Sequence, residues 1–303
     1  MTEVLVVGMA VVDFLFEVDD MPVKPEKYQA NNARLVGGGG AANAACAIAK
    51  LGGKAVLACR TGCDVLGDWL IADLERHHVD CSLLITSEQS RTSFSSVLVD
   101  SRGERQIINF RGVDLSEDTD LIENASPDVV LADTRWRAGT HAAMRLARRK
   151  RLPALLDAEA PLDSDSMALA THIVFSRQGL ASIATQLDSP SAIELALREL
   201  ASQYSAWLGM TDGVNGVYYL HDGKFCHEPA IQVTVADTLG AGDVWHGAFA
   251  YQLGCGFNEP AAVRFANAFA TLKCMRAGGG RNSPSLKEVT QFLQTHDNQW
   301  KQR

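Results

Sequence analysis

Several features that would define common protein classes are missing from this sequence. No stretch of the 303 residues approaches about eighteen uninterrupted apolar residues, which excludes a membrane-spanning helix. Lys and Arg number 28 against 36 Asp and Glu, and the resulting net charge of −8 argues against a nucleic-acid partner. The N-terminus, MTEVLVVGMAVVD, has no basic segment before its apolar run, so we expect a first strand rather than a signal peptide.

Cysteine pairs with the spacing of a redox motif or a zinc site are also missing. The seven cysteines are an odd number, include no Cys-x-x-Cys, and mostly lie within apolar runs. This usage indicates small core residues in a reducing cytoplasm, where we expect the protein to reside. His77, His78 and Cys81 are close in sequence, but no second ligand pair follows at a zinc-like spacing. We therefore assign no metal ligands from the sequence.

The chain has two glycine-rich stretches, and neither is a Walker A loop or a dinucleotide fingerprint, because the required flanking residues are absent. The second of them, Asp237–Asp243, is followed by a run of small apolar residues that predicts a helix. A glycine-rich turn that enters a helix leaves backbone N–H groups free and forms an anion site. Asp243 would repel a phosphate there, so we expect it to accept a proton from a hydroxyl. An anion site beside a carboxylate base is typical of a kinase.

The stretch from Asp237 to Ala250 resembles the C-terminal signature of the PfkB (ribokinase-like) carbohydrate kinases along its whole length. The resemblance implies that Asp243 is the catalytic base. It also implies that the N–H groups of Gly240, Ala241 and Gly242 form the anion hole for the phosphoryl group in transfer.

Short apolar strands alternate with helical patterns over the rest of the chain, which predicts a mainly parallel sheet covered on both faces. With the resemblance, we expect a ribokinase-like three-layer αβα sandwich that spans residues 1–303 as one domain. Segments at about 12–35 and 93–111 alternate imperfectly between apolar and polar residues, and we expect them to form a small β-sheet lid over the sugar site. A lid excludes water that would otherwise hydrolyse ATP.

Sugar-binding residues follow from position and from the resemblance. Asp13 comes soon after the first apolar run, and we expect it at the ligand edge of the sheet. The first glycine-rich stretch, Gly37–Asn43, lets a ligand approach the backbone closely. In the family the residues that match Asp13 and Asn43 bind sugar hydroxyls, and Gly38 and Gly39 belong to the same motif.

The nucleotide residues are implied by the resemblance alone. The turn with Thr211, Gly213 and Gly216 matches a motif along the nucleotide phosphates, while Asn267 and Gly279 match regions beside the adenine. The expected cofactors are ATP and Mg²⁺. The family's Asn-x-x-Glu motif, linked to magnesium, is replaced by Ser176-Arg177-Gln178-Gly179. How the ion is held is therefore left open.

Three residues suit a substrate with a negative charge: Lys27, Asn109 and Arg135. Arg135 follows the strand Val129–Ala132 and should lie at the ligand edge of the sheet. An arginine there supplies a fork for an oxyanion. The segments GERQIINF and VVLADTRW resemble the 6-deoxy-6-sulfofructose kinase branch, which implies phosphorylation of a primary hydroxyl of that ketose. A fructokinase, a ribokinase or a 2-keto-3-deoxygluconate kinase remains an alternative.

Two other function classes stay open. One is a non-catalytic sugar-binding regulator on the same fold, although the intact Gly-Ala-Gly-Asp argues against it. The other is a nucleoside kinase, whose site should be more aromatic and lack Arg135. An exposed lid sheet invites pairing through its edges or face, so we expect a homodimer through the lid. The other partners expected are the sugar and ATP, with no nucleic acid and no membrane.

Overall fold

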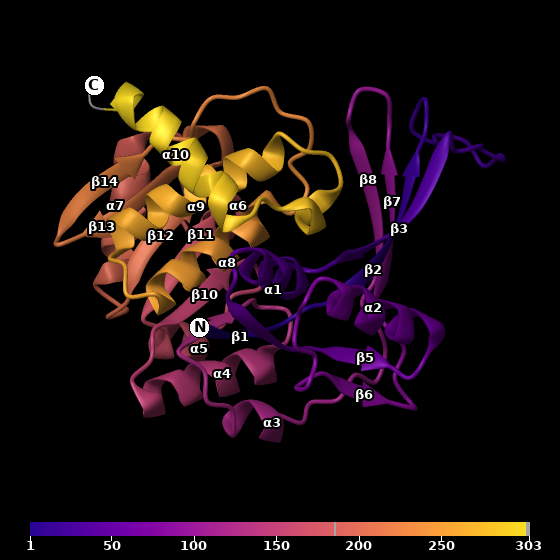
Figure 1. The fold of residues 1–303 in the computed structure, drawn as a ribbon, viewed down its shortest axis with the longest axis horizontal. Helices are drawn as coiled ribbons and strands as arrows, with labels where there is room; N and C mark the ends of the chain where they lie inside the picture. The colour runs from indigo at the N-terminus through magenta and orange to yellow at the C-terminus, as the bar shows by residue number, and fades with distance from the viewer. Residues whose placement is uncertain (185, 301–303) are drawn as a thin grey trace.

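Buried aliphatic runs form the central sheet of the protein, in a computed structural model that describes residues 1–184 and 186–300. Its eight strands run in the order β14-β13-β12-β11-β10-β9-β1-β4 (Figure 1). The six strands from β12 to β4 are parallel, and the edge hairpin β13–β14 is antiparallel. The strands are β1 (Glu3–Val7), β4 (Lys54–Ala58), β9 (Val129–Ala132), β10 (Ala154–Ala158), β11 (His172–Ser176), β12 (Trp207–Thr211), β13 (Val217–His221) and β14 (Lys224–Glu228).

Helices cover both faces of this sheet. Because neighbouring residues of a strand point to opposite faces, Val4 and Val6 of β1 belong to one hydrophobic core and Leu5 and Val7 to the other. The first core contains α1 (Gly40–Lys50), α2 (Val65–Arg76), α8 (Ala241–Gly254), α9 (Glu259–Cys274) and α10 (Leu286–Trp300). The second contains α3 (Asp120–Glu123), α4 (Arg137–Lys150), α5 (Ser164–Leu169), α6 (Arg177–Ala181) and α7 (Pro190–Ala201). The layers agree with the predicted three-layer αβα fold.

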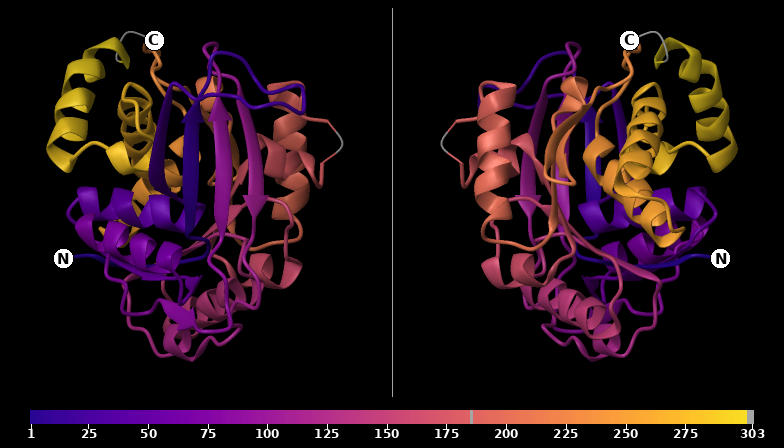
Figure 2. Two further views of the ribbon diagram at one scale, coloured as in Figure 1. Left: turned by 90° about the vertical axis from the view of Figure 1, so that its right-hand side faces the viewer. Right: turned by 90° about the vertical axis from the view of Figure 1, so that its left-hand side faces the viewer.

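A second, four-stranded sheet stands beside the body and corresponds to the predicted lid (Figures 1 and 2). Its order is β3-β2-β7-β8, from β3 (Asn32–Gly38), β2 (Val11–Glu17), β7 (Phe94–Val99) and β8 (Arg105–Phe110). Register places Asp13, Ser95 and Asn109 in one row across three strands. Since residues in one row share a face of the sheet, these three polar side chains are presented together. A short pair, β5 (Arg60–Gly62) with β6 (Ile85–Ser87), lies below the lid.

Asp13 lies inside lid strand β2, because the chain turns at Gly8 after β1 and enters the lid directly. Gly8 has φ +150°, and a Cβ there would lie 2.2 Å from the Asp133 carboxyl carbon. Only glycine lets the chain pass Asp133 this closely.

The elements β4, β14 and α2 were not predicted from the sequence. None of the helices in the described part of the chain combines the length and apolar character needed to cross a bilayer.

Candidate active site

The N-terminus of α8 is left open toward a cavity. Gly240 precedes the helix in the left-handed conformation, φ 75°, and no side chain caps it. The N–H of Ala241 donates to the Thr238 carbonyl oxygen at 3.1 Å. The prediction for Ala241 is therefore corrected, because its N–H closes the turn. The N–H groups of Gly240 and Gly242, predicted from the sequence, and that of Asp243 have no acceptor among the described residues.

Asp237 holds the loop that carries these donors. Its carboxylate accepts from the N–H groups of Leu239 at 2.8 Å, Gly279 at 2.9 Å and Gly278 at 3.2 Å. Burial acts to raise the pKa of Asp237, but these hydrogen bonds prevail and lower it. The carboxylate thus joins the loop before α8 to the loop that enters the 3₁₀ helix η2 (Gly279–Asn282).

A chain of hydrogen bonds fixes the Asp243 side chain. Asn43, on α1, donates from Nδ2 to Asp243 Oδ2 at 2.7 Å. Arg281, on η2, donates from Nη1 to Asn43 Oδ1 at 3.2 Å and to the Ala42 carbonyl at 3.0 Å. Its Nε donates to Asp73 Oδ2 of α2 at 3.0 Å. The roles of Arg281 and Asp73 were not predicted from the sequence, because nothing in the local sequence links positions 208 residues apart. Asn43 orients Asp243 in this arrangement, in addition to the sugar contact predicted for it.

A cavity of about 340 Å³ lies between the lid and the carboxyl edge of the sheet. It brings together most of the predicted substrate and catalytic residues. From these sets, its lining includes Asp13, Gly38, Gly39, Asn43, Asn109, Arg135, Gly240 and Asp243. Lys27 is different, since it lies in the exposed segment between β2 and β3 and lines no part of the cavity. In a single chain the structure does not bring Lys27 to the other predicted residues.

Asp13 and Gly38 illustrate how closely this cavity is built. A Cβ on Gly38 would lie 2.2 Å from Asp13 Oδ2, so only glycine leaves room for the carboxylate. Burial raises the pKa of Asp13, although a hydrogen bond from Ser95 and the charge of Arg281 oppose this. A carboxylate with this placement can accept hydrogen bonds from ligand hydroxyl groups.

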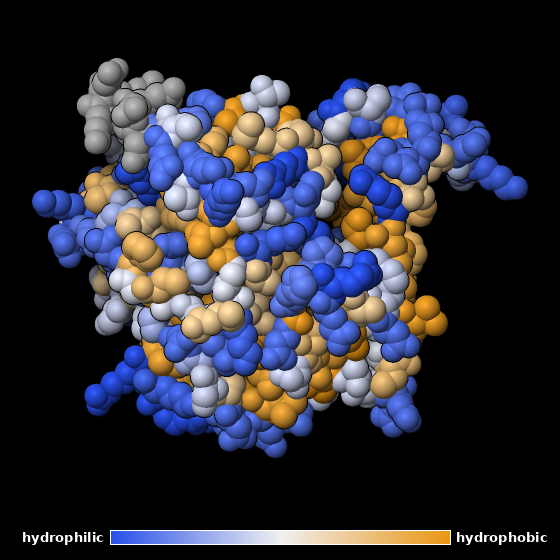
Figure 3. All heavy atoms as spheres, viewed as in Figure 1, coloured by the Kyte–Doolittle hydropathy of each residue, from blue (hydrophilic) through white to orange (hydrophobic). Residues whose placement is uncertain are grey.

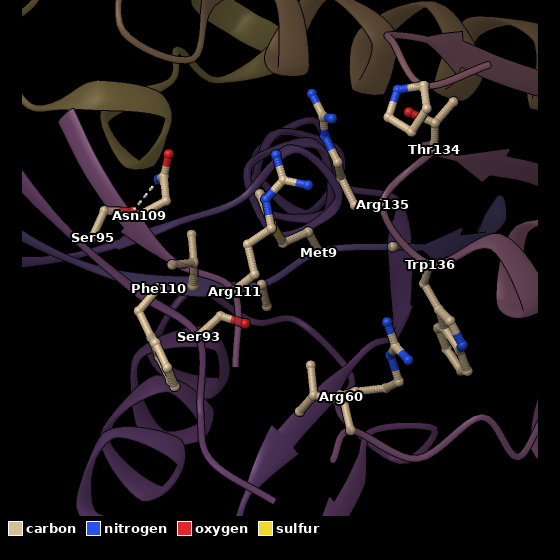
Figure 4. A pocket seen from close by; sticks show the side chains of 15 residues that line it. Met9, Arg60, Ser93, Ser95, Asn109, Phe110, Arg111, Thr134, Arg135 and Trp136 are labelled. Carbon is tan, nitrogen blue, oxygen red and sulfur yellow. Dashed lines mark hydrogen bonds between the residues drawn. The ribbon is translucent and has the colours of Figure 1, made fainter. Parts of the chain in front are cut away.

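A smaller cavity of about 210 Å³ adjoins the first and shares Met9, Val11, Ser95, Asn109 and Arg135 with it (Figure 4). Three arginines line it, namely Arg60, Arg111 and Arg135, and no carboxylate is among its described lining residues. The Arg135 guanidinium donates from Nη1 to the Ala160 carbonyl at 2.7 Å and forms no ion pair within the described chain. Arg60 pairs with Glu117 and lies 4.8 Å above the Trp136 ring. Arg60 and Arg111 were missed by the sequence reading, because both lie in segments without a motif.

A third cavity, of about 340 Å³, is lined mostly by apolar residues and begins at the first turn of α8. It contains four of the predicted nucleotide residues, namely Thr211, Gly213, Gly216 and Asn267; the fifth, Gly279, lines the first cavity instead. The Asn267 amide is already bonded to Trp245 Nε1 at 2.7 Å and the Glu228 carbonyl at 3.2 Å. Asn267 therefore shapes this cavity with its polar atoms engaged by the protein.

Asp157 is a buried carboxyl group on the wall of the first cavity, at the end of β10. Burial raises the pKa of Asp157 to about 7, with smaller contributions from Asp243, Asp133 and Glu159. His246 Nε2 lies 3.5 Å from Asp157 Oδ1 and acts in the opposite direction. The wall next to Asp243 thus holds a carboxyl group that the fold keeps partly protonated.

Comparison with known proteins identifies relatives over almost the whole chain. The family model described as pfkB family carbohydrate kinase matches residues 1–286. The ribokinase of Bacillus subtilis (strain 168) is 27% identical over 306 residues, covering 97% of this chain and all of the relative. A solved structure of a ribokinase candidate from Agrobacterium tumefaciens aligns with a TM-score of 0.88 at 31% identity, covering 100% of this chain and 99% of that one. The ribokinase of Arabidopsis thaliana, solved with ribose and ATP, aligns with a TM-score of 0.85 at 23% identity, covering 96% of this chain and 98% of that one.

The raised pKa of Asp157 predicts a pH-dependent effect of Asp157→Asn on stability. The folded state binds the proton more tightly than the unfolded chain, so the contribution of Asp157 to stability is full below pH of about 4. It is lost as the pH rises toward about 7. Asparagine carries no charge at any of these pH values. The Tm of the variant relative to the wild type should therefore increase between pH 4.5 and pH 8, as measured by calorimetry.

Asp163→Asn is a control in which the pKa shift has the opposite sign. Asp163 caps α5, and hydrogen bonds from Ser166 outweigh burial and lower its pKa. The contribution of Asp163 to stability is present above pH of about 4, so the Tm difference between this variant and the wild type should stay nearly constant from pH 4.5 to pH 8 and shrink only at more acidic pH. A difference between Asp157→Asn and wild type that stays constant with pH would contradict the assignment of a raised pKa.

Proposed function

Because the chain belongs to the PfkB family of carbohydrate kinases, we propose that it transfers the γ-phosphoryl group of ATP to a primary hydroxyl of an anionic ketose. The observation that carries the proposal is the separation of charge between the two adjoining cavities. Carboxylates predominate in the cavity around Asp243, where hydroxyl groups can bind, although Arg34 and Arg135 line it too. The adjoining cavity has three arginines, including the shared Arg135, and no carboxylate among its described lining residues. A sugar that spans both would place a hydroxyl at Asp243 and an anion at the arginines. Our candidate substrate is 6-deoxy-6-sulfofructose, because its sulfonate is a fixed anion that arginine side chains can hold.

The nucleotide fits the remaining features. The apolar third cavity suits an aromatic base, and the open N–H groups of Gly242 and Asp243 suit the phosphates of ATP. Within the described residues no group of three or more His, Cys, Asp or Glu side chains is arranged to hold a metal ion. A magnesium ion would therefore be bound largely by the nucleotide, with Asp157 and Glu159 as the carboxylates of the cavity wall. Bound Mg²⁺ neutralises phosphate charge during transfer.

The residues of this chain then have distinct tasks. Asp243 accepts the proton of the attacked sugar hydroxyl as the new oxygen–phosphorus bond forms and the bond to the leaving ADP breaks. Asn43 holds the Asp243 carboxylate in place through its 2.7 Å hydrogen bond. The N–H groups of Gly242 and Asp243 stabilise the charge on the transferred group, without reorientation, because the helix fixes them. Asp13 binds hydroxyl groups from the lid side, Asn109 lies with Arg135 where the anionic end of the sugar would bind, and lid closure excludes water.

A neutral-sugar kinase is the second candidate, and the relatives support it. Curated relatives include deoxyribokinase from Salmonella typhimurium, 23% identical over 305 residues, beside the ribokinases. Ribose and deoxyribose have no group that needs Arg135 or Arg111. A panel of neutral and anionic sugars with ATP separates the candidates, since each predicts a different preferred substrate.

Asp243→Asn tests the reaction itself. The amide keeps the shape of the carboxylate and can still accept the hydrogen bond from Asn43 through its oxygen, but it cannot take up the proton. A positioned base contributes roughly 10²–10⁴-fold to the rate, so kcat should fall by at least about 10²-fold. Affinities for sugar and ATP, measured by calorimetry, should remain nearly unchanged. A kcat close to that of the wild type would remove Asp243 from the role of base.

Arg135→Ala tests the anionic substrate. Loss of a charge-assisted hydrogen bond in a closed site costs about 1.5–3 kcal/mol, roughly tenfold to over a hundredfold. We expect kcat/KM for 6-deoxy-6-sulfofructose to fall by this factor and that for fructose to change little. Arg137→Ala is the matched control, because Arg137 is two residues away and pairs with Asp163 outside the cavities. A wild type that prefers ribose or fructose, or equal losses on both sugars, would decide for the neutral-sugar kinase.

We also propose that two copies of the chain pair through the outer face of the lid. The row Leu35, Phe14, Ser96 and Ile108 lies on the face opposite Asp13. Ile108 is 65% exposed and Leu35 is 36% exposed. Figure 2 shows no helix in front of this sheet, and Figure 3 shows the lid edge-on, with a hydrophilic upper end and hydrophobic residues lower down. Such exposed apolar surface on a sheet is typical of an interface.

Ile108→Asp should therefore convert a dimer to a monomer in analytical ultracentrifugation at micromolar concentration. Leu195→Asp is the control, because Leu195 is 61% exposed on α7, away from the lid. A wild type that sediments as a monomer, or a dimer that survives Ile108→Asp, would contradict this pairing.

A further inference from the structure

Lys273, in the last turn of α9, is completely buried, with 0% of its surface exposed. Its ammonium group donates one hydrogen bond, to the backbone carbonyl oxygen of Asp237 at 2.9 Å. The Asp237 carboxylate is near but not bonded, with Oδ2 at 3.8 Å. Within the described residues no other acceptor contacts Nζ. An ammonium group can donate three hydrogen bonds, so this buried cation is sparsely satisfied.

Such an arrangement costs stability, since removing a charge from water is unfavourable unless partners replace the water. Burial lowers the pKa of Lys273, and the charge of Asp237 opposes the change. The packing of the fold alone does not explain why a charged lysine occupies position 273. A methionine would fill a similar volume without the cost of removing a charge from water, and Asp237 would keep its other hydrogen bonds.

The position of the ammonium group suggests what it does. Asp237 begins the loop that leads to Gly240 and the open N–H groups of Gly242 and Asp243. On the carboxylate side of Asp237, bonds from Leu239, Gly278 and Gly279 fix the loop, and Arg105 of lid strand β8 adds a contact at 3.0 Å. The backbone carbonyl oxygen of Asp237 accepts a hydrogen bond from the Lys273 ammonium group. The ammonium group therefore fixes the peptide group after Asp237 and adds a positive charge behind the anion hole.

We propose that Lys273 is a positioning residue, whose buried ammonium group holds the Asp237–Gly240 loop so that the N–H groups of Gly242 and Asp243 face the phosphoryl group. The inference rests on the proposed phosphoryl transfer but not on the identity of the sugar. Lys273 itself lines none of the three cavities described above. It acts on the reaction through the loop.

Lys273→Met is the first test. Asp237 keeps its bonds from Leu239, Gly278, Gly279 and Arg105, so the Tm of the variant should stay within a few degrees of the wild type. Amide hydrogen exchange of Leu239 and Ala241, whose N–H groups are hydrogen-bonded within this loop, should become at least about tenfold faster, with exchange in the rest of the protein unchanged. With any sugar that is turned over, kcat should fall about 10- to 100-fold, while KM for the sugar stays within about twofold.

Lys150→Met is the matched control. Lys150 also lies in the last turn of a helix and donates to a backbone carbonyl, that of Ala125 at 2.8 Å, but it is solvent-exposed. This variant should leave hydrogen exchange near Asp243 and kcat unchanged. Exchange of the Leu239 and Ala241 amides is measurable even if no sugar is phosphorylated, so failure of the proposed function and failure of this inference are distinguishable.

Lys273→Ala provides a second test that does not depend on the methionine variant. It leaves a space that ammonium or methylammonium can enter, whereas tetramethylammonium is too large. If ammonium and methylammonium, but not tetramethylammonium, restore slow exchange and kcat in a saturable way, a cation at this position holds the loop. The inference would be overturned if Lys273→Met lost stability with no selective change in exchange at the loop, or retained wild-type kcat, or if no small cation restored Lys273→Ala.

Discussion

The structure depends on keeping one helix N-terminus open. Helices α2, α7 and α9 begin with a side-chain cap, from Asp64, Ser189 and Asn258 respectively, whereas α4 begins after Trp136 without one. The helices α1 and α8 begin with glycine and have no such cap. At α1 the Asp133 carboxylate takes the place of a cap, since it accepts from Ala41 N–H at 3.2 Å and Met9 N–H at 2.8 Å. Of these two helices, only α8 presents unbonded backbone N–H groups to the cavity. An uncapped helix end costs stability unless a ligand accepts hydrogen bonds from those groups.

An open N-terminus that also carries a carboxylate needs support from elsewhere. Asp243 is held by Asn43, which is held by Arg281, which is paired with the buried Asp73. A Cβ on Gly37 would lie 2.3 Å from Arg281 Nη2, so the glycine-rich stretch before α1 serves this side chain as well as the ligand. The lid contributes through the row of Asp13, Ser95 and Asn109 and through the contact of Arg105 with Asp237. The lid and the anion hole therefore meet at a single carboxylate.

The sequence was a good guide wherever the chemistry is local. Hydrophobic runs located most of the strands of the sheet, and the Gly-Ala-Gly-Asp turn located the open end of α8, because spacing along the chain determines both. It was a poor guide where partners are distant in sequence. Nothing near Arg281 indicates Asp73, nothing near Lys273 indicates Asp237, and Arg60 and Arg111 gain meaning only when the lid brings their segments together. The same limit explains Lys27, whose sequence position near the lid did not determine where its exposed loop would lie.

The distribution of buried charge follows from one requirement, that a site for hydroxyl groups and an anionic phosphoryl group must exist in an acidic protein. Asp13, Asp133, Asp157 and Asp243 lie around one cavity, and together they would repel phosphate. Burial raises the pKa of Asp13, Asp133 and Asp157, and that of Asp157 to about 7, so Asp157 adds less than a full negative charge to this wall. Arg281 and Lys273 place compensating positive charges behind the two segments that face the ligand, α1 and the loop before α8. Cations behind the backbone neutralise the site without occupying it, so that the surface the ligand meets consists of hydrogen-bond donors with fixed direction rather than mobile charged side chains.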